Sequence, residues 1–114
     1  MVERVKSVQE YFDTLQNRFV ADKAKGVDTQ ITYDISGDTG GVWTITVRDQ
    51  TLSIDTGNVE KPKVTIMMEA GEYVDMVNGD LDGTKAYMTR KLKVKGSIPM
   101  AQKMKKFLPV RKKD

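Results

Sequence analysis

The side chains that could do acid–base or metal chemistry in this sequence are carboxylates, which occur in close pairs. Asp80 and Asp82 flank one leucine, and Glu69 and Glu72 are spaced for one face of a helix. Asp82 is a good N-cap, and the glutamates complement the positive end of a helix dipole. A cation site gathers more oxygen ligands than the aspartate pair offers. We therefore expect structural roles, with no catalytic residue, metal site or cofactor.

Two residue types are absent from the 114 residues, histidine and cysteine. Their absence excludes disulfides, a thiol nucleophile, a Ser-His-Asp triad and the commonest metal ligands. The sequence has neither a signal-peptide pattern nor an apolar run near the roughly 18 residues that span a membrane. We therefore expect a non-enzymatic cytoplasmic protein.

The net charge of +3 conceals two oppositely charged parts. Residues 1–84 carry 8 basic and 15 acidic side chains, whereas residues 85–114 carry 11 basic and 1 acidic. A basic surface attracts anionic membranes or nucleic acid, but the aromatic residues lie on apolar faces and not among the lysines. We expect either a solvated face or a membrane-facing one, and no nucleic-acid partner. The lysines concerned are Lys91, Lys93, Lys95, Lys103, Lys105 and Lys106.

Hydrophobic periodicity predicts a helix first and then strands. Val5, Val8, Phe12, Leu15 and Phe19 follow helical spacing, so an amphipathic helix should run toward residue 26, with Arg18 among its water-facing residues. Alternating patterns then predict strands near residues 31–36, 43–48, 52–54 and 64–68. A tight hairpin should join the second strand to the third through residues 49–50.

The second half of the chain predicts two short helices, a strand and a final helix. The first short helix opens at residues 69–72, and the second follows Asp82 and carries Ala86, Tyr87 and Met88. Alternation over residues 91–95 predicts a fifth strand with three lysines on one face. Ser97 should cap a last helix that ends at Pro109. The order predicts one α+β domain over residues 1–114, a two-layer fold whose five-stranded, mainly antiparallel sheet has helices covering one face, with residues 111–114 a flexible tail.

Methionine is concentrated where the helices must cover the sheet. The six concerned are Met67, Met68, Met76, Met88, Met100 and Met104. Methionine packs ordinary cores and also lines adaptable apolar pockets. Spacing alone leaves both interpretations open.

Several segments together resemble the sterol carrier protein-2 (SCP-2) family of lipid-transfer domains. They are residues 64–68, 73–81, 86–88, 91–97 and 101–104, with Trp43 where the family commonly has tryptophan. The resemblance implies a tunnel between sheet and helices that takes fatty acids, acyl-CoA, sterols or phospholipids. The positions that match the tunnel wall are Trp43, Ile45, Ile54, Ile66, Met68, Tyr73, Val77, Ala86, Leu92, Met100 and Met104.

The sequence departs from the family at two places. Arg90 stands where the family often has glycine, and the chain ends soon after Leu108, without a longer C-terminal cover or a peroxisomal tripeptide. The resemblance therefore favours a carrier that binds or transfers a fatty acid, a fatty acyl-CoA or a sterol as a monomer or weak dimer. Two alternatives stay open: a protein-interaction or dimerisation module that uses the same groove, and an enzyme accessory domain acting through Asp80 or Glu72.

Overall fold

The computed structural model describes residues 4–109, so the expected tail at 111–114 lies outside the described residues. Five strands form one sheet in the order β3-β2-β1-β4-β5. The β1–β4 pair is parallel, and the other pairs are antiparallel. The predicted α+β class and the mainly antiparallel five-stranded sheet are thus confirmed. The strands are β1 (Thr29–Ser36), β2 (Gly41–Arg48), β3 (Thr51–Thr56), β4 (Val64–Glu69) and β5 (Lys93–Gly96).

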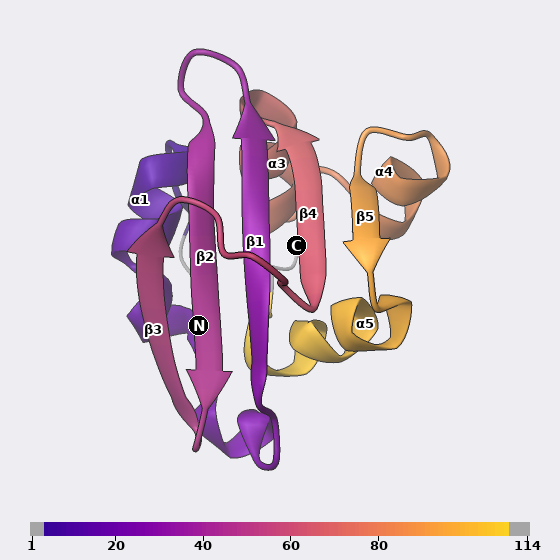
Figure 1. Cartoon of the computed structure of the whole chain (residues 1–114). Coiled ribbons are helices and arrows are strands. Elements are labelled where there is room, and N and C mark those ends of the chain that lie inside the picture. The colour runs from indigo at the N-terminus through magenta and orange to yellow at the C-terminus, as the bar shows by residue number, and fades with distance from the viewer. Residues whose placement is uncertain (1–3, 110–114) are drawn as a thin grey trace.

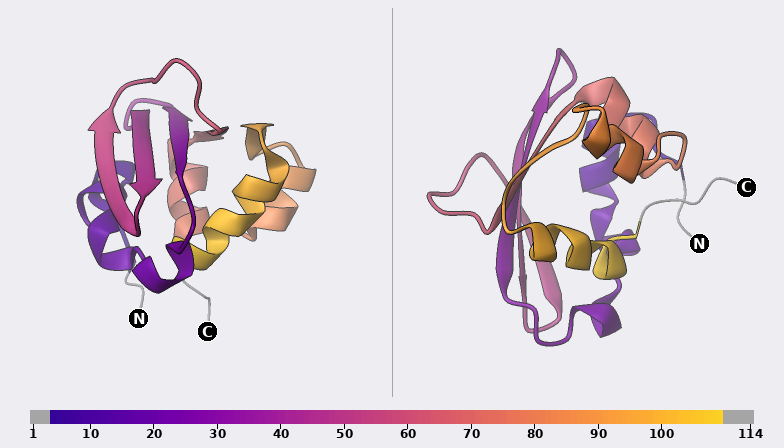
Figure 2. Two further views of the ribbon diagram at one scale, coloured as in Figure 1. Left: turned by 60° about the horizontal axis from the view of Figure 1, so that its bottom comes forward. Right: turned by 90° about the vertical axis from the view of Figure 1, so that its right-hand side faces the viewer.

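The helices cover one face of this sheet. They are α1 (Val8–Asp13), α2 (Leu15–Arg18), the 3-10 helix η1 (Ala21–Ala24), α3 (Ala70–Val77), α4 (Gly83–Met88) and α5 (Ile98–Phe107). Figure 1 views the sheet from its uncovered face, with the helices behind it and beyond its β5 edge. In the edge-on view of Figure 2, α3 and α4 lie over one end of the sheet and α5 over the other.

The N-terminal helix is shorter than its periodicity predicts. It breaks at Thr14, whose φ of −109° and ψ of 9° lie outside the helical region. The Thr14 hydroxyl donates to the Glu10 carbonyl at 2.7 Å, an interaction with the helix's own backbone that favours such bends. The apolar stripe nevertheless reaches the core, because Val8, Phe12 and Leu15 are buried.

Arg18 does not face water, contrary to the sequence prediction. Only 9% of it is exposed, and its guanidinium lies over the Tyr11 ring, 5.6 Å from the ring centroid. Its Nη2 also donates to the Thr14 hydroxyl at 3.0 Å. A cation over an aromatic face gains electrostatic attraction, which helps to offset its loss of hydration.

The hairpin between β2 and β3 forms as predicted. Arg48 pairs with Thr51, and the two intervening residues Asp49 and Gln50 have φ of 52° and 61°. Two consecutive left-handed residues match the right-handed twist of the flanking strands.

Alternation along β1 separates the two faces of the sheet. Ile31 and Tyr33 point into the helical layer and are buried in the core. Thr32 lies on the opposite face, where its hydroxyl is 2.9 Å from that of Thr44. Thr44 in turn donates to the Gly57 carbonyl at 2.8 Å, so the β3–β4 connection shields these hydroxyls from water.

The C-terminal half shows the predicted caps but a shorter fifth strand. The side chains of Asp82 and Ser97 cap α4 and α5 as predicted, and that of Glu69 caps α3. Strand β5 begins at Lys93, so Lys91 precedes the strand, and only Lys93 and Lys95 of the three predicted lysines lie on it. The main chain turns before Lys91 because its amide donates to the Ala86 carbonyl at 2.8 Å and closes the end of α4.

Candidate apolar-ligand site

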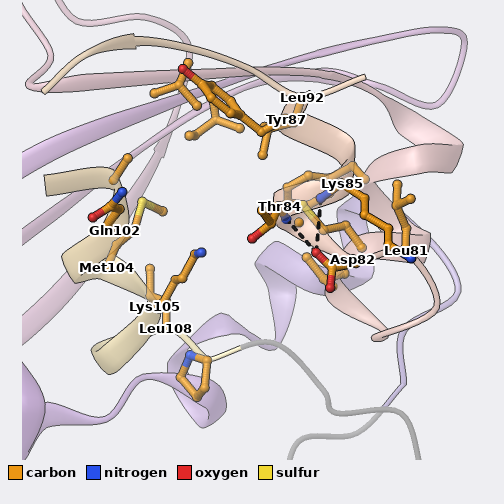
Figure 3. Close-up of a pocket in the computed structure, with 18 of the residues that line it drawn as sticks. Leu81, Asp82, Thr84, Lys85, Tyr87, Leu92, Gln102, Met104, Lys105 and Leu108 are labelled. Atoms are coloured by element: carbon orange, nitrogen blue, oxygen red, sulfur yellow. Dashed lines mark hydrogen bonds between the residues drawn. The ribbon is translucent and has the colours of Figure 1, made fainter. Parts of the chain in front are cut away.

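A cavity of about 1040 Å³ lies between α3–α4 and α5, above β4 and β5. Its size reaches the upper end of the range for small-molecule sites, about 300–1,000 Å³. In Figure 3, Leu81 and Thr84 at one side face Met104 of α5 and Leu108, just after α5, at the other. The cavity therefore lies between the sheet and its helical cover and is partly open to solvent.

Most of the wall is apolar and comes from five elements and their adjoining loops. Each strand or helix presents one face, as its periodicity requires. The apolar residues are Ile66 (β4), Tyr73, Met76 and Val77 (α3), Leu81 (α3–α4 loop), Tyr87 (α4), Leu92 and Val94 (β5 and the turn before it), and Ile98, Ala101, Met104, Leu108 and Pro109 (α5 and its C-terminal end).

Charged side chains surround one part of this wall. Asp80 pairs with the exposed Arg4, at 2.6 Å between carboxylate and guanidinium, and this hydrogen bond raises the pKa of Arg4. Asp82 accepts the amides of Thr84 and Lys85 at 2.8 and 3.1 Å. These bonds lower the Asp82 pKa, helped by the charges of Lys85 and Lys105. Asp82 thus holds the backbone at the start of α4, in keeping with its predicted capping role, whereas Asp80 binds the Arg4 side chain.

Three tyrosines, Tyr11 from α1, Tyr33 from β1 and Tyr73 from α3, form the buried part of the wall. Each is at most 5% exposed, and the Tyr11 and Tyr33 rings lie 5.4 and 5.9 Å from Tyr73, centroid to centroid, in edge-to-face contacts. Burial raises the pKa of Tyr11, and raises the pKa of Tyr33 and Tyr73 well above the ordinary value. These phenols are therefore neutral hydrogen-bonding groups near neutral pH.

The structure brings five of the eleven residues that the resemblance assigned to the wall together in this cavity. They are Ile66, Tyr73, Val77, Leu92 and Met104. The other six do not line it. They are Trp43, Ile45, Ile54, Met68, Ala86 and Met100.

Position in the sheet explains most of the residues that do not line the cavity. Ile45 and Ile54 lie on β2 and β3, at the far side of the sheet from β5, and Figure 1 shows α1 behind that side of the sheet. Trp43 stacks on Phe12, with ring centroids 4.6 Å apart, and is one layer removed from Tyr73. Met68 is 4% exposed and packs within the core. These side chains face inward, as predicted, but toward core rather than cavity.

Sequence reasoning missed Tyr11 and Tyr33 as cavity residues. Tyr33 stands on the inward face of a predicted strand, between two residues that pack in the core. Tyr11 adjoins the predicted stripe, three residues after Val8 and four before Leu15. Helical spacing could therefore have placed Tyr11 inside, but only the tertiary fold brings it beside Tyr73.

Two kinds of site are missing from the part of the chain that the structure describes. Residues 4–109 contain no group of three or more carboxylates suited to a metal ion. No helix among these residues is long and apolar enough to cross a membrane.

The model of the SCP-2 sterol transfer family matches residues 11–109. The chain belongs to the SCP-2 sterol transfer family. This match covers every element of the sheet and both helical walls of the cavity. The resemblance seen in the sequence is therefore confirmed.

Curated relatives include hydroxysteroid dehydrogenase-like protein 2 of Bos taurus, 28% identical over 106 residues. The alignment covers 92% of this chain and 25% of that protein, so the chain spans about a quarter of the relative's length. The similarity thus concerns one part of a longer protein.

Solved structures show the same fold. The palmitated SCP2L2 of Aedes aegypti has a TM-score of 0.71 at 20% identity, covering 96% of this chain and 100% of that one. The sec-alkylsulfatase Pisa1 from Pseudomonas sp. gives 0.72 at 23% identity, covering 92% of this chain and 16% of that one. The fold thus occurs both as a separate chain and as a part of a larger one.

Proposed function

We propose that this protein is a non-enzymatic carrier that binds a fatty acid, a fatty acyl-CoA or another lipid with one long apolar chain. The observation that supports this function is the cavity of about 1040 Å³ between α3–α4 and α5, in a chain of the SCP-2 sterol transfer family. Removal of the ligand's apolar surface from water supplies the binding energy. The palmitated SCP2L2 has a related fold, which is consistent with a chain of similar length here.

Chain length is the direct test of this mechanism. Each buried methylene contributes about 0.8 kcal/mol, so affinity should rise about fourfold per added carbon until the cavity is filled. Titrating fatty acids of 8 to 18 carbons against a bound fluorescent dye measures this slope. An affinity that does not depend on chain length would contradict burial in the cavity.

A matched pair of variants locates the binding. Ala101 on α5 lines the cavity, and Ala101→Phe fills part of it, so affinity for the longest chains should fall at least tenfold. Ala21→Phe makes the same change on an exposed residue of η1 and should leave affinity unchanged. Equal effects of the two substitutions would place the ligand elsewhere.

We propose in addition that the carrier meets anionic membranes through its basic edge, the exposed lysines Lys91, Lys93, Lys95, Lys103, Lys105 and Lys106. Three large apolar residues are exposed on α4 and α5 near them: Tyr87, Met88 and Ile98, at 50%, 75% and 39%. Cationic side chains attract anionic headgroups, and exposed apolar side chains insert beneath them. Tyr87 and Ile98 also line the cavity, so membrane contact would lie next to the ligand's path.

The same exposed residues support the alternative proposal, that this protein is an interaction or dimerisation module. Met88 is among the most exposed large apolar side chains and has no role in the core. Light scattering distinguishes the two proposals: a lipid-binding monomer supports the carrier, whereas a dimer that Met88→Ser dissociates and that binds no lipid supports the module.

A further inference from the structure

The proposed carrier function leaves the tyrosines of the cavity unexplained. An apolar chain needs only apolar walls, and the neighbouring Phe12 shows that phenylalanine fits in this layer, 3% exposed. Tyr11, Tyr33 and Tyr73 each add a hydroxyl in the same region. Burying a hydroxyl costs free energy unless it finds a hydrogen-bond partner. The Tyr11 and Tyr73 hydroxyls interact with each other, which leaves the Tyr33 hydroxyl to be explained.

The hydroxyls belong to separate elements that the fold brings together. Tyr11 comes from α1, Tyr33 from β1 and Tyr73 from α3, and all three line the cavity. The Tyr33 ring also contacts Phe12, at 5.2 Å between centroids. Among residues 4–109, no hydrogen bond holds the Tyr33 hydroxyl, although Tyr33 is only 2% exposed. A ligand atom that enters this region would therefore meet an available donor.

The surroundings determine which ligand group fits. The three phenols are buried at the core side of the cavity, whereas the charged Asp80, Asp82, Lys85 and Lys105 surround its other parts and are exposed. Burial around the three phenols disfavours an ionised headgroup, because the charge would lose part of its hydration. A neutral hydroxyl can be buried here, because a hydrogen bond to a tyrosine hydroxyl replaces its hydrogen bond to water.

We infer that Tyr11, Tyr33 and Tyr73 form a polar subsite that receives the neutral hydroxyl group of an amphiphilic ligand, with its apolar chain running toward α4 and α5. This inference rests on the proposed carrier function and adds a ligand class, long-chain alcohols and other lipids with an un-ionised hydroxyl. It also assigns the ligand an orientation, head group inward.

Two probes that differ by one hydroxyl test this subsite. The affinities of 1-dodecanol and dodecane are measured by displacement of a neutral fluorescent dye from the full chain. Tyr11→Phe, Tyr33→Phe and Tyr73→Phe each remove one hydroxyl and keep the ring. The ratio of dodecanol to dodecane affinity should fall about two- to tenfold, most clearly for Tyr33→Phe.

Dodecane binding serves as the internal check on folding and on cavity shape. The control Thr32→Val removes a buried hydroxyl from the opposite face of the sheet and should leave the affinity ratio unchanged. A ratio that none of the three tyrosine variants changes, with dodecane still bound, would overturn the subsite and leave the carrier proposal standing. Failure of both probes to displace the dye from the unmodified protein would overturn both proposals.

Discussion

At the scale of single residues, the buried phenols make stability depend on pH. Burial raises the pKa of Tyr33 and Tyr73 well above the ordinary value. The neighbouring Tyr11 raises both further, whereas the Arg18 charge lowers that of Tyr73. The folded state therefore retains these protons more tightly than the unfolded chain, in which tyrosine titrates near pH about 10. Their contribution is complete below that pH and is lost as the pH rises toward the folded-state pKa.

Tyr33→Phe should therefore reduce the alkaline loss of stability. Each tyrosine that keeps its proton in the folded state contributes a slope of up to about 1.4 kcal/mol per pH unit above pH about 10. Urea unfolding at pH 8, 9, 10 and 11 measures this slope for the variant and the unmodified protein. The values at pH 8 serve as the reference, since both states are neutral there. Identical slopes in the two proteins would contradict a raised pKa at Tyr33.

At the scale of elements, the turn between α4 and β5 holds a residue in a conformation that glycine prefers. Arg90 has a φ of 65°, and α4 ends beside it, where the Arg90 backbone N–H donates a hydrogen bond to the Tyr87 carbonyl at 3.2 Å. The backbone adopts this glycine-type geometry although the side chain is arginine. The turn therefore holds a residue with a Cβ in the left-handed region, at a cost in backbone strain.

Arg90→Gly should stabilise the protein by about 1 kcal/mol, because it relieves the left-handed conformation of a residue that carries a Cβ. The midpoint of urea unfolding measures the change. Lys91→Gly, at the next position, lacks a positive φ and should destabilise by about 0.5–1 kcal/mol through added chain entropy. A loss of stability in Arg90→Gly would show that the arginine side chain outweighs the backbone strain.

At the scale of the whole molecule, the charge of the C-terminal part is concentrated on one side of the fold. The basic edge joins the turn before β5, β5 itself and α5, which Figure 1 shows at the same side of the sheet. Attraction between exposed charges decays within about 8 Å at physiological ionic strength. Binding to anionic vesicles should therefore weaken steeply as salt is raised.

The double substitution Lys93→Glu with Lys95→Glu should weaken binding to phosphatidylserine vesicles about tenfold or more, since each lysine near an anionic surface contributes about 1 kcal/mol. Vesicle sedimentation between 50 and 300 mM salt measures both effects. Lys23→Glu with Lys25→Glu, on or next to η1, gives the same change in net charge outside the basic edge and should weaken binding less. If the two double variants lose vesicle binding equally, the attraction depends on net charge alone.

The sequence by itself determined the elements of this protein. Period-two patterns marked the strands, and the side chains of Asp82 and Ser97 marked the starts of α4 and α5, because these signals depend on neighbours a few residues away. The N-terminal helix was predicted too long. A hydrophobic pattern does not reveal the hydrogen bond that the Thr14 hydroxyl donates to the Glu10 carbonyl.

Only the tertiary structure decided which inward-facing residues border a cavity. Ile45 and Ile66 both alternate on apolar strand faces, yet Ile45 is sealed in the core and Ile66 lines the cavity. The difference comes from the strand order, which puts β4 and β5 beneath the space between α4 and α5. The meeting of Tyr11, Tyr33 and Tyr73 has the same origin: it joins residues 62 positions apart, and local periodicity carries no information about contacts over that separation.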